Sequence, residues 1–275
     1  MDYETLERTI KGKNYKYSII GKSVTGRNIY CVRGVNIGNK KVLLVGALHA
    51  REYITADLIM RIFERQNRCV CANFFVVPML NPDGVNLCKY GINSVPITFR
   101  ENLTKYNAGN LDFSMWKANV RGVDINNNFD AGWHREFEHR KTKPASQGYY
   151  GKMPESEPET RAIVKFIRKL KPDICIAFHT KGEELYFEYY NRDKERDRRV
   201  AEVFAQGLGY AIKNYEQSSS AGLKDWCVEK QNMVAFTLEC GADSECHPIR
   251  ESRLDVIYEK FKNFYQMINE SVKLC

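Results

Sequence analysis

The stretch KKVLLVGALHAREYIT, residues 40–55, carries the pattern that decides the fold. Its first nine residues, 40–48, form an apolar run of the kind found in a strand buried at the centre of a sheet. The apolar residues that come next recur at helical spacing, namely Ile54, Leu58, Ile59, Ile62 and Phe63. His49 and Glu52 lie three residues apart at the join between the predicted strand and the predicted helix.

The remaining chain repeats this alternation of strand and helix. Further strands are predicted at 15–20, 28–35, 73–80, 172–178 and 232–239. Further helices are predicted behind a capping box formed by Ser156 and Glu159, at about 196–208, around 224–230 and at 250–273. This order predicts an α/β fold with a mixed, mainly parallel central sheet and helices on both faces.

Between these elements, the NPDG sequence at 81–84 has turn chemistry, and residues 85–122 have weak periodicity and many Asn, Gly and Lys residues. We expect a long loop region there, of the sort that carries functional sites. The sequence shows no internal repeat, linker or break in composition, so we expect residues 1–275 to form a single domain.

The composition is that of a globular protein, with 43% hydrophobic and 28% charged residues in 275. No apolar run approaches the roughly 18 residues of a membrane helix, and the N-terminal sequence has no apolar signal core. The nine cysteines are odd in number and irregular in spacing, which favours small buried hydrophobes in a reducing compartment over disulfides. We therefore expect a cytoplasmic protein with no membrane partner.

The net charge of +8 is compatible with nucleic acid or with an acidic small substrate as the partner. The sequence contains no basic stripe with interleaved aromatic residues and no known nucleic-acid motif. Nucleic-acid binding is accordingly the weakest of the functions considered, and we expect no nucleic-acid partner.

Three polar residues stand at the ends of predicted strands, where open α/β sheets form their sites: His49, His179 and Glu239. Two histidines and one carboxylate leave a tetrahedral zinc ion with one open position, which is the catalytic arrangement. A second carboxylate nearby can act as general base. Because a histidine and a glutamate three residues apart occur often by chance, His49 and Glu52 gain weight only from the motifs that accompany them.

Those motifs occur in a specific order along the chain: GALHAREYIT (46–55), MLNPDGV (79–85), KANVRGVDINNNF (117–129), AFHTKGEELYF (177–187) and GLKDWCVEKQNMVAFTLECG (222–241). Together they resemble the zinc carboxypeptidase family, the carboxypeptidase A-like metallopeptidases. The resemblance runs from about residue 20 to residue 249, nearly the whole chain. It implies a hydrolase whose metal is held by the His₂Glu ligand set of carboxypeptidase A.

By this resemblance, His49, Glu52 and His179 are the ligands of one Zn²⁺ per chain, and Glu239 is the general base for a zinc-activated water. Asp124 matches the carboxylate that accepts the other ring N–H of the first histidine and so fixes its tautomer.

Arg121 matches the arginine that polarises the scissile carbonyl and stabilises the oxyanion. Family members that trim C-terminal residues carry Asn-Arg at the place of Asn126 and Asn127, and this pair anchors the terminal carboxylate of the substrate. The present chain has Asn127 in place of the arginine, and a neutral amide cannot make the charged bidentate contact.

The sequences HTKGEELYF, LKDW and ECG instead resemble bacterial peptidases that cut between D-glutamate and meso-diaminopimelate in peptidoglycan stem peptides. The implied partner is a peptide or muropeptide. A general metallocarboxypeptidase, a small-molecule amidohydrolase (deacylase) on the same fold and a binding protein without catalysis remain as alternatives. The sequence leaves the oligomeric state open.

Overall fold

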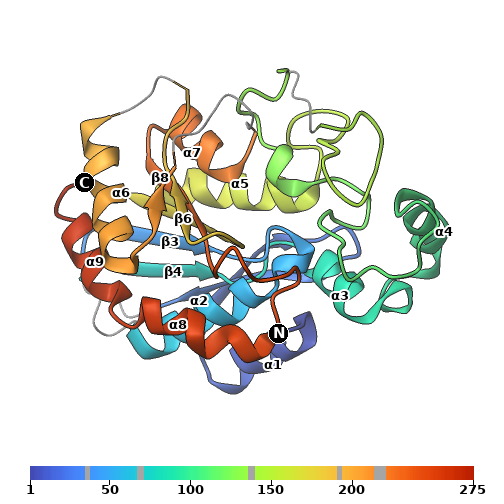
Figure 1. Cartoon of the computed structure of the whole chain (residues 1–275), viewed down its shortest axis with the longest axis horizontal. Coiled ribbons are helices and arrows are strands. Elements are labelled where there is room, and N and C mark those ends of the chain that lie inside the picture. The colour runs from blue at the N-terminus through green and yellow to red at the C-terminus, as the bar shows by residue number, and fades with distance from the viewer. Residues whose placement is uncertain (35–37, 67–70, 136–139, 191–193, 214–220) are drawn as a thin grey trace.

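The structure, a computed structural model, describes residues 1–34, 38–66, 71–135, 140–190, 194–213 and 221–275. Within these residues, an eight-stranded sheet has the strand order β1-β2-β4-β3-β5-β8-β6-β7 (Figure 1). The strands are β1 (Lys16–Lys22), β2 (Asn28–Arg33), β3 (Lys41–Val45), β4 (Asn73–Val77), β5 (Ile174–His179), β6 (Glu184–Tyr186), β7 (Ala211–Ile212) and β8 (Val234–Glu239).

The four central strands β4, β3, β5 and β8 run parallel, so their carboxyl ends meet at one edge of the sheet. Antiparallel pairs flank them, β1 with β2, β2 with β4, and β6 with β8. The predicted α/β class with a mixed, mainly parallel sheet is confirmed.

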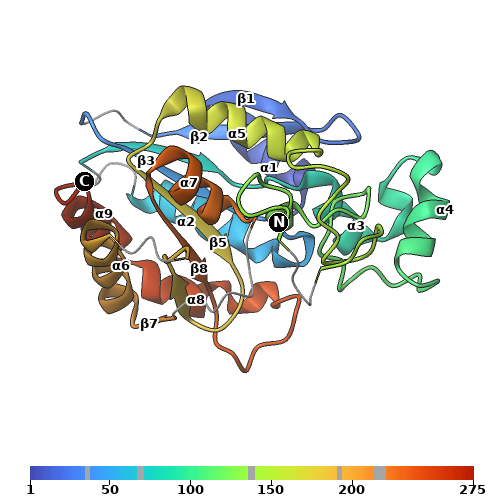
Figure 2. The ribbon, with the colours of Figure 1, turned by 90° about the horizontal axis from the view of Figure 1, so that it is seen from above.

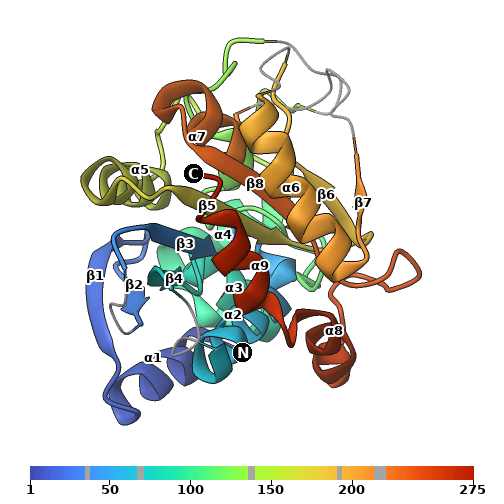
Figure 3. The ribbon, with the colours of Figure 1, turned by 90° about the vertical axis from the view of Figure 1, so that its left-hand side faces the viewer.

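Helices cover both faces of the sheet (Figures 2 and 3). One hydrophobic cluster packs against α1 (Tyr3–Gly12), α2 (Ile54–Gln66), α6 (Glu195–Leu208), α8 (Leu254–Phe261) and α9 (Phe264–Ser271). The other packs against α5 (Pro158–Leu170) and α7 (Leu223–Gln231). Successive residues of β3 alternate between the clusters, and each fully buried aliphatic side chain contributes about 1.5–3 kcal/mol.

The loop predicted at 85–122 is wrong over 85–90 and 97–106, because the range contains most of α3 (Pro82–Tyr90) and all of α4 (Ile97–Tyr106). The sequence NPDG starts a helix here: the Asn81 side chain accepts a hydrogen bond from Gly84 N at 3.0 Å, and Pro82 occupies the first turn. Seven residues of α3 are buried, all round the helix, so no amphipathic period reveals it.

The predicted capping box at the start of α5 is also wrong. The N-cap is Glu157, and the helix begins at Pro158, whose fixed φ suits the first helical position. Ser156 Oγ donates to the Glu157 carboxylate at 2.8 Å. Glu159 is fully buried and accepts a hydrogen bond from Val24 N at 3.0 Å, so its carboxylate serves a tertiary contact.

The single C-terminal helix predicted at 250–273 is two helices, α8 and α9, which meet at residues 262–263. They separate because α8 packs against α2 while α9 packs mainly against α6. The prediction also omits α1 and the short strands β6 and β7.

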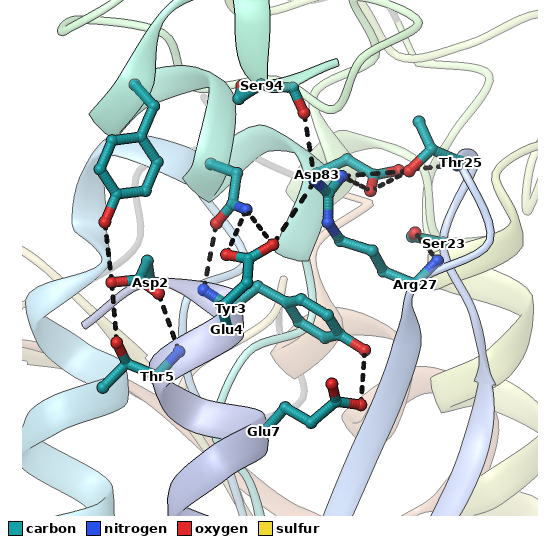
Figure 4. A network of polar contacts seen from close by, with 12 residues as sticks. Asp2, Tyr3, Glu4, Thr5, Glu7, Ser23, Thr25, Arg27, Asp83 and Ser94 are labelled. Atoms are coloured by element: carbon teal, nitrogen blue, oxygen red, sulfur yellow. Dashed lines mark hydrogen bonds and ion pairs between the residues drawn. The ribbon is translucent and has the colours of Figure 1, made fainter. Parts of the chain in front are cut away.

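A polar network ties the N-terminal helix, the β1–β2 turn and α3 together (Figure 4). Asp83, which is fully buried, accepts hydrogen bonds from Thr25 N at 2.8 Å and Arg27 Nη1 at 2.8 Å. Asn81, at the start of the same helix, donates to the carbonyls of Leu48 and Ala118. Because these carbonyls belong to the segments that carry His49 and residue 117, α3 helps to position both.

No helix among the described residues is long and apolar enough to cross a membrane. The predicted burial of the cysteines holds for Cys31, Cys88, Cys175, Cys227 and Cys240, whereas Cys71 and Cys246 are exposed. Cys69 lies outside the described residues.

Candidate metal centre and active site

His49, Glu52 and His179 come together at the carboxyl edge of the parallel strands. His179 is the last residue of β5, whereas β3 ends at Val45, four residues before His49, contrary to the predicted strand 40–48. Past the end of β3, Gly46 N donates to Val77 O and Leu80 N donates to Gly46 O. These hydrogen bonds continue the pairing of β3 with β4 toward His49. His49 caps the short 3₁₀ helix Ala50–Glu52, which presents both side chains from one corner.

The ligand atoms of these residues fit a metal ion. One ligand atom of each lies within 4.8 Å of the others, and all three residues are at least 95% buried. The two Nδ1 atoms are 3.0 Å apart, and each lies 2.9 Å from an oxygen of Glu52. Two imidazole nitrogens and a carboxylate that converge in this way are the nitrogen and oxygen donors that zinc takes.

The two histidines decide the charge of Glu52. Burial opposes ionisation of Glu52, but His49 and His179 hold its pKa well below the ordinary value. The carboxylate is therefore ionised and ready to act as a ligand.

Asp124 lies behind His49, as the resemblance implies. Its Oδ1 is 3.2 Å from His49 Nε2, and its Oδ2 accepts a hydrogen bond from Gly148 N at 3.1 Å. The carboxylate is fully buried; burial alone would raise its pKa, but Lys117 and His49 hold the pKa far below the usual range. Asp124 thus lies on the Nε2 side of the His49 ring, while Nδ1 lies on the side of Glu52.

Glu239 ends β8 beside His179, and the two residues are paired in the register of the parallel strands. Burial raises the pKa of Glu239 to about 7; His179 and Lys117 oppose this shift, and the carboxylates of Glu52 and Glu184 add to it. A carboxylate with a pKa near neutrality is suited to accept and return a proton.

No hydrogen bond or ion pair joins Arg121 to His49, Glu52, His179 or Glu239 in the described part of the chain. The Arg121 side chain is about half exposed, and its Nη1 lies 3.7 Å from Glu157 Oε2. Lys117 is a cation beside the cluster: its Nζ lies 3.6 Å from Asp124 Oδ2, and its charge lowers the pKa of both Asp124 and Glu239. Sequence reasoning missed Lys117, although it opens the same motif, KANVRGVD.

The path of the loop that separates these two cations is set by one side chain. Asn119, fully buried, accepts hydrogen bonds at Oδ1 from Arg121 N (2.9 Å) and Val123 N (3.1 Å). Its Nδ2 donates to Glu157 Oε2 at 2.8 Å. The turn that results carries the Arg121 side chain toward Glu157.

Asn126 and Asn127 lie in a 3₁₀ helix that follows Asp124. Asn126 Oδ1 accepts a hydrogen bond from Leu223 N at 3.0 Å, so this segment braces the start of α7. The next residue of α7 is Lys224, a buried cation whose Nζ lies 2.5 Å from Asp225 Oδ1. Sequence reasoning did not single out Lys224, because one lysine on a short helix has no distinctive spacing.

His247 is a second neighbour that the motifs did not reveal. It lies on a loop, as does His134, and its Nδ1 is 3.4 Å from Thr180 Oγ1, next to the predicted ligand His179. Burial lowers the pKa of His247, so its neutral form is favoured. His139 lies outside the described residues.

Comparisons with known proteins point to one family. The Peptidase_M14 family model, described as zinc carboxypeptidase, matches residues 6–263. The uncharacterized protein YqgT of Bacillus subtilis (strain 168) is 32% identical over 250 residues, which are 84% of this chain and 66% of YqgT. Gamma-D-glutamyl-L-diamino acid endopeptidase 1 of Lysinibacillus sphaericus is 29% identical over 281 residues, 94% of this chain and 69% of that protein. The chain thus spans about two thirds of the length of both relatives.

Solved structures share the fold. Bovine thrombin-activatable fibrinolysis inhibitor, in complex with tick carboxypeptidase inhibitor, superposes with a TM-score of 0.81 at 18% identity, over 100% of this chain and 98% of that one. Murein-tripeptide amidase MpaA of Escherichia coli O157 gives a TM-score of 0.59 at 20% identity, over 93% and 91%. Because the family model covers most of the sequence, the chain belongs to the zinc carboxypeptidase (Peptidase_M14) family and is a zinc metallopeptidase.

Proposed function

We propose that this chain binds one zinc ion through His49, Glu52 and His179 and hydrolyses the γ-D-glutamyl–meso-diaminopimelate bond of peptidoglycan-derived peptides. The convergence of three buried ligand atoms within 4.8 Å supports the metal site. The neutral Asn127 and the endopeptidase of Lysinibacillus sphaericus among the relatives support the substrate.

Zinc, when bound, supplies a Lewis acid that polarises a carbonyl and lowers the pKa of water to about 7. The residues of the chain do the rest. Glu239 takes a proton from the attacking water and returns it to the leaving amine, which balances the hydrolysis of one amide bond. Asp124 holds His49 in the tautomer that leaves Nδ1 free for the metal.

We infer that Lys117 supports the developing oxyanion in place of Arg121, because its ammonium lies beside Asp124 and its charge reaches Glu239. Lys117→Gln is expected to lower kcat by about 10²-fold, the usual value for one oxyanion donor. Arg121→Gln removes a positive charge from another position of the same motif, and the kcat of this variant is expected to stay within roughly threefold of the wild-type value. Steady-state kinetics and zinc content of both variants check this prediction. A larger loss of kcat in Arg121→Gln than in Lys117→Gln would assign support of the oxyanion to Arg121.

The substrate end of the site is proposed from its polar groups. Diaminopimelate ends in both a carboxylate and an ammonium, and an amide such as Asn127 can donate to the first and accept from the second. An arginine there would repel the ammonium.

L-Ala-γ-D-Glu-meso-diaminopimelate is expected to be cleaved with a kcat/KM roughly 10- to 200-fold above its L-lysine counterpart, because lysine leaves the polar groups that would meet the far carboxylate unpaired. An N-capped dipeptide with a free C-terminal carboxylate serves as the carboxypeptidase substrate, and an N-acyl amino acid as the deacylase substrate. Asn127→Arg should shift preference toward the capped dipeptide. If the wild type prefers the capped dipeptide, the protein is a carboxypeptidase. If it prefers the N-acyl amino acid, the protein is a deacylase.

A further inference from the structure

A cavity of about 560 Å³ lies between α4 and the loops that precede α5. Figures 1 and 2 show α4 at the far right, beyond the end of the sheet, with these loops beside it. The lining includes none of His49, Glu52, His179 and Glu239, so the cavity is separate from the proposed metal site. Its size and its apolar walls are typical of sites for small molecules, and the walls include Phe99, Tyr106, Tyr149, Val120, Val123 and Met153.

The two carboxylates in the lining already have partners. Glu157 is buried and accepts hydrogen bonds from Asn119 Nδ2 and Ser156 Oγ, each at 2.8 Å. Glu155 Oε1 lies 3.8 Å from the guanidinium of Arg168, a residue outside the lining. Each carboxylate also has a cation beside it, Arg168 for Glu155 and Arg121 for Glu157 at 3.7 Å, which offsets its charge.

Two of the three cations in the lining, Lys152 and Arg161, form no ion pair with a carboxylate of the described residues. Lys152 is exposed and has no ion pair or hydrogen bond to any described residue. Arg121 is paired with Glu157 at 3.7 Å, so its charge is offset within the lining. Arg161 donates to the backbone carbonyls of Glu155 and Ser156 and keeps its charge. The cavity thus combines aromatic walls with positive charge that the chain itself leaves available.

We propose that this cavity is a second binding site, for a small ligand with an aromatic or otherwise apolar body and one anionic group. The apolar body would displace water from the rings and aliphatic side chains, and the anionic group would lie against Lys152. The site adjoins the metal centre through the backbone, because Tyr149 O accepts the hydrogen bond of Asp124 N at 2.7 Å. This inference goes beyond the proposed peptidase activity and does not depend on it.

Two dyes with one ring skeleton test the proposal on the zinc-loaded protein: 1-anilinonaphthalene-8-sulfonate, an anion, and N-phenyl-1-naphthylamine, its uncharged analogue. Fluorescence titration is expected to show saturable one-to-one binding of both, with the anion bound roughly two- to fivefold more tightly, the usual value for one partly exposed ion pair. Lys152→Gln should remove that preference and leave the neutral dye unaffected. Lys165→Gln, on the exposed face of α5 outside the lining, should change neither dye.

Blocking the mouth separates this cavity from other apolar surfaces. Asn102 is an exposed residue of α4 in the lining, and Asn102→Trp is expected to weaken both dyes by roughly tenfold or more, because the added ring fills the space. Thr98→Trp, exposed on the same helix but outside the lining, is the matched control and should leave both affinities unchanged. Equal effects of the two tryptophans, equal effects of the two glutamines, or no saturable binding would each overturn the proposal.

Discussion

His179→Ala is expected to bind no zinc at concentrations that saturate the wild type and to lose at least ~10³-fold in peptidase rate. The variant leaves two of three ligands, and a Lewis acid at the reacting carbonyl is worth several kcal/mol of barrier, with about 1.4 kcal/mol for each tenfold. The fold should survive, because β5 keeps its ladder to β3 and β8 without this side chain.

Three measurements on the same samples check this result. Metal analysis after dialysis measures zinc content, circular dichroism checks the fold, and thermal unfolding measures how much zinc binding stabilises the folded state. Zinc at 100 times its Kd should stabilise the wild type by about 2.7 kcal/mol and leave the variant unchanged. His134→Ala, at an exposed loop histidine, is the control and should keep both zinc and activity. A His179→Ala protein that is folded, zinc-loaded and active would remove His179 from the ligand set.

The sequence predicts the central strands of the fold because strands that are buried on both faces appear in the sequence as short apolar runs. The strands of the parallel core are short apolar runs, and the structure places β4 at Asn73–Val77 and β8 at Val234–Glu239, within the predicted ranges. His179 and Glu239 then meet at one edge because parallel strands of similar length end together.

The parts that were missed depend on contacts remote in sequence. The helix α3 is buried all round, so it has no polar face to reveal its period. The strands β6 and β7 have three and two residues, too few for an alternation, and their pairing with β8 and with each other defines them. Lys117 and Arg121 share one motif, and the hydrogen bonds of Asn119 decide which of them faces the cluster.

Glu239→Gln is expected to keep zinc and the fold while its turnover falls by ~10²–10⁴-fold. The amide has nearly the same shape as the carboxylate but cannot accept a proton from water, so the loss should appear in kcat more than in KM. Zinc content and thermal unfolding equal to the wild type distinguish this loss from that of His179→Ala. Turnover near that of the wild type would show that another group moves the proton.

The pH profile gives a second signature of the same residue. Burial raises the pKa of Glu239 to about 7 in the metal-free protein, and a dication nearby favours the carboxylate, so the zinc-loaded enzyme should titrate below pH 7. Since the base must be deprotonated, kcat/KM of the wild type should fall tenfold per pH unit once the pH drops below that pKa. Glutamine does not titrate, so the residual rate of Glu239→Gln should lack this limb. An acid limb that persists unchanged in the variant would assign the titration to a different group. The first candidate is Glu184, which is paired with Glu239 on the neighbouring strand β6, and Glu184→Gln would test it.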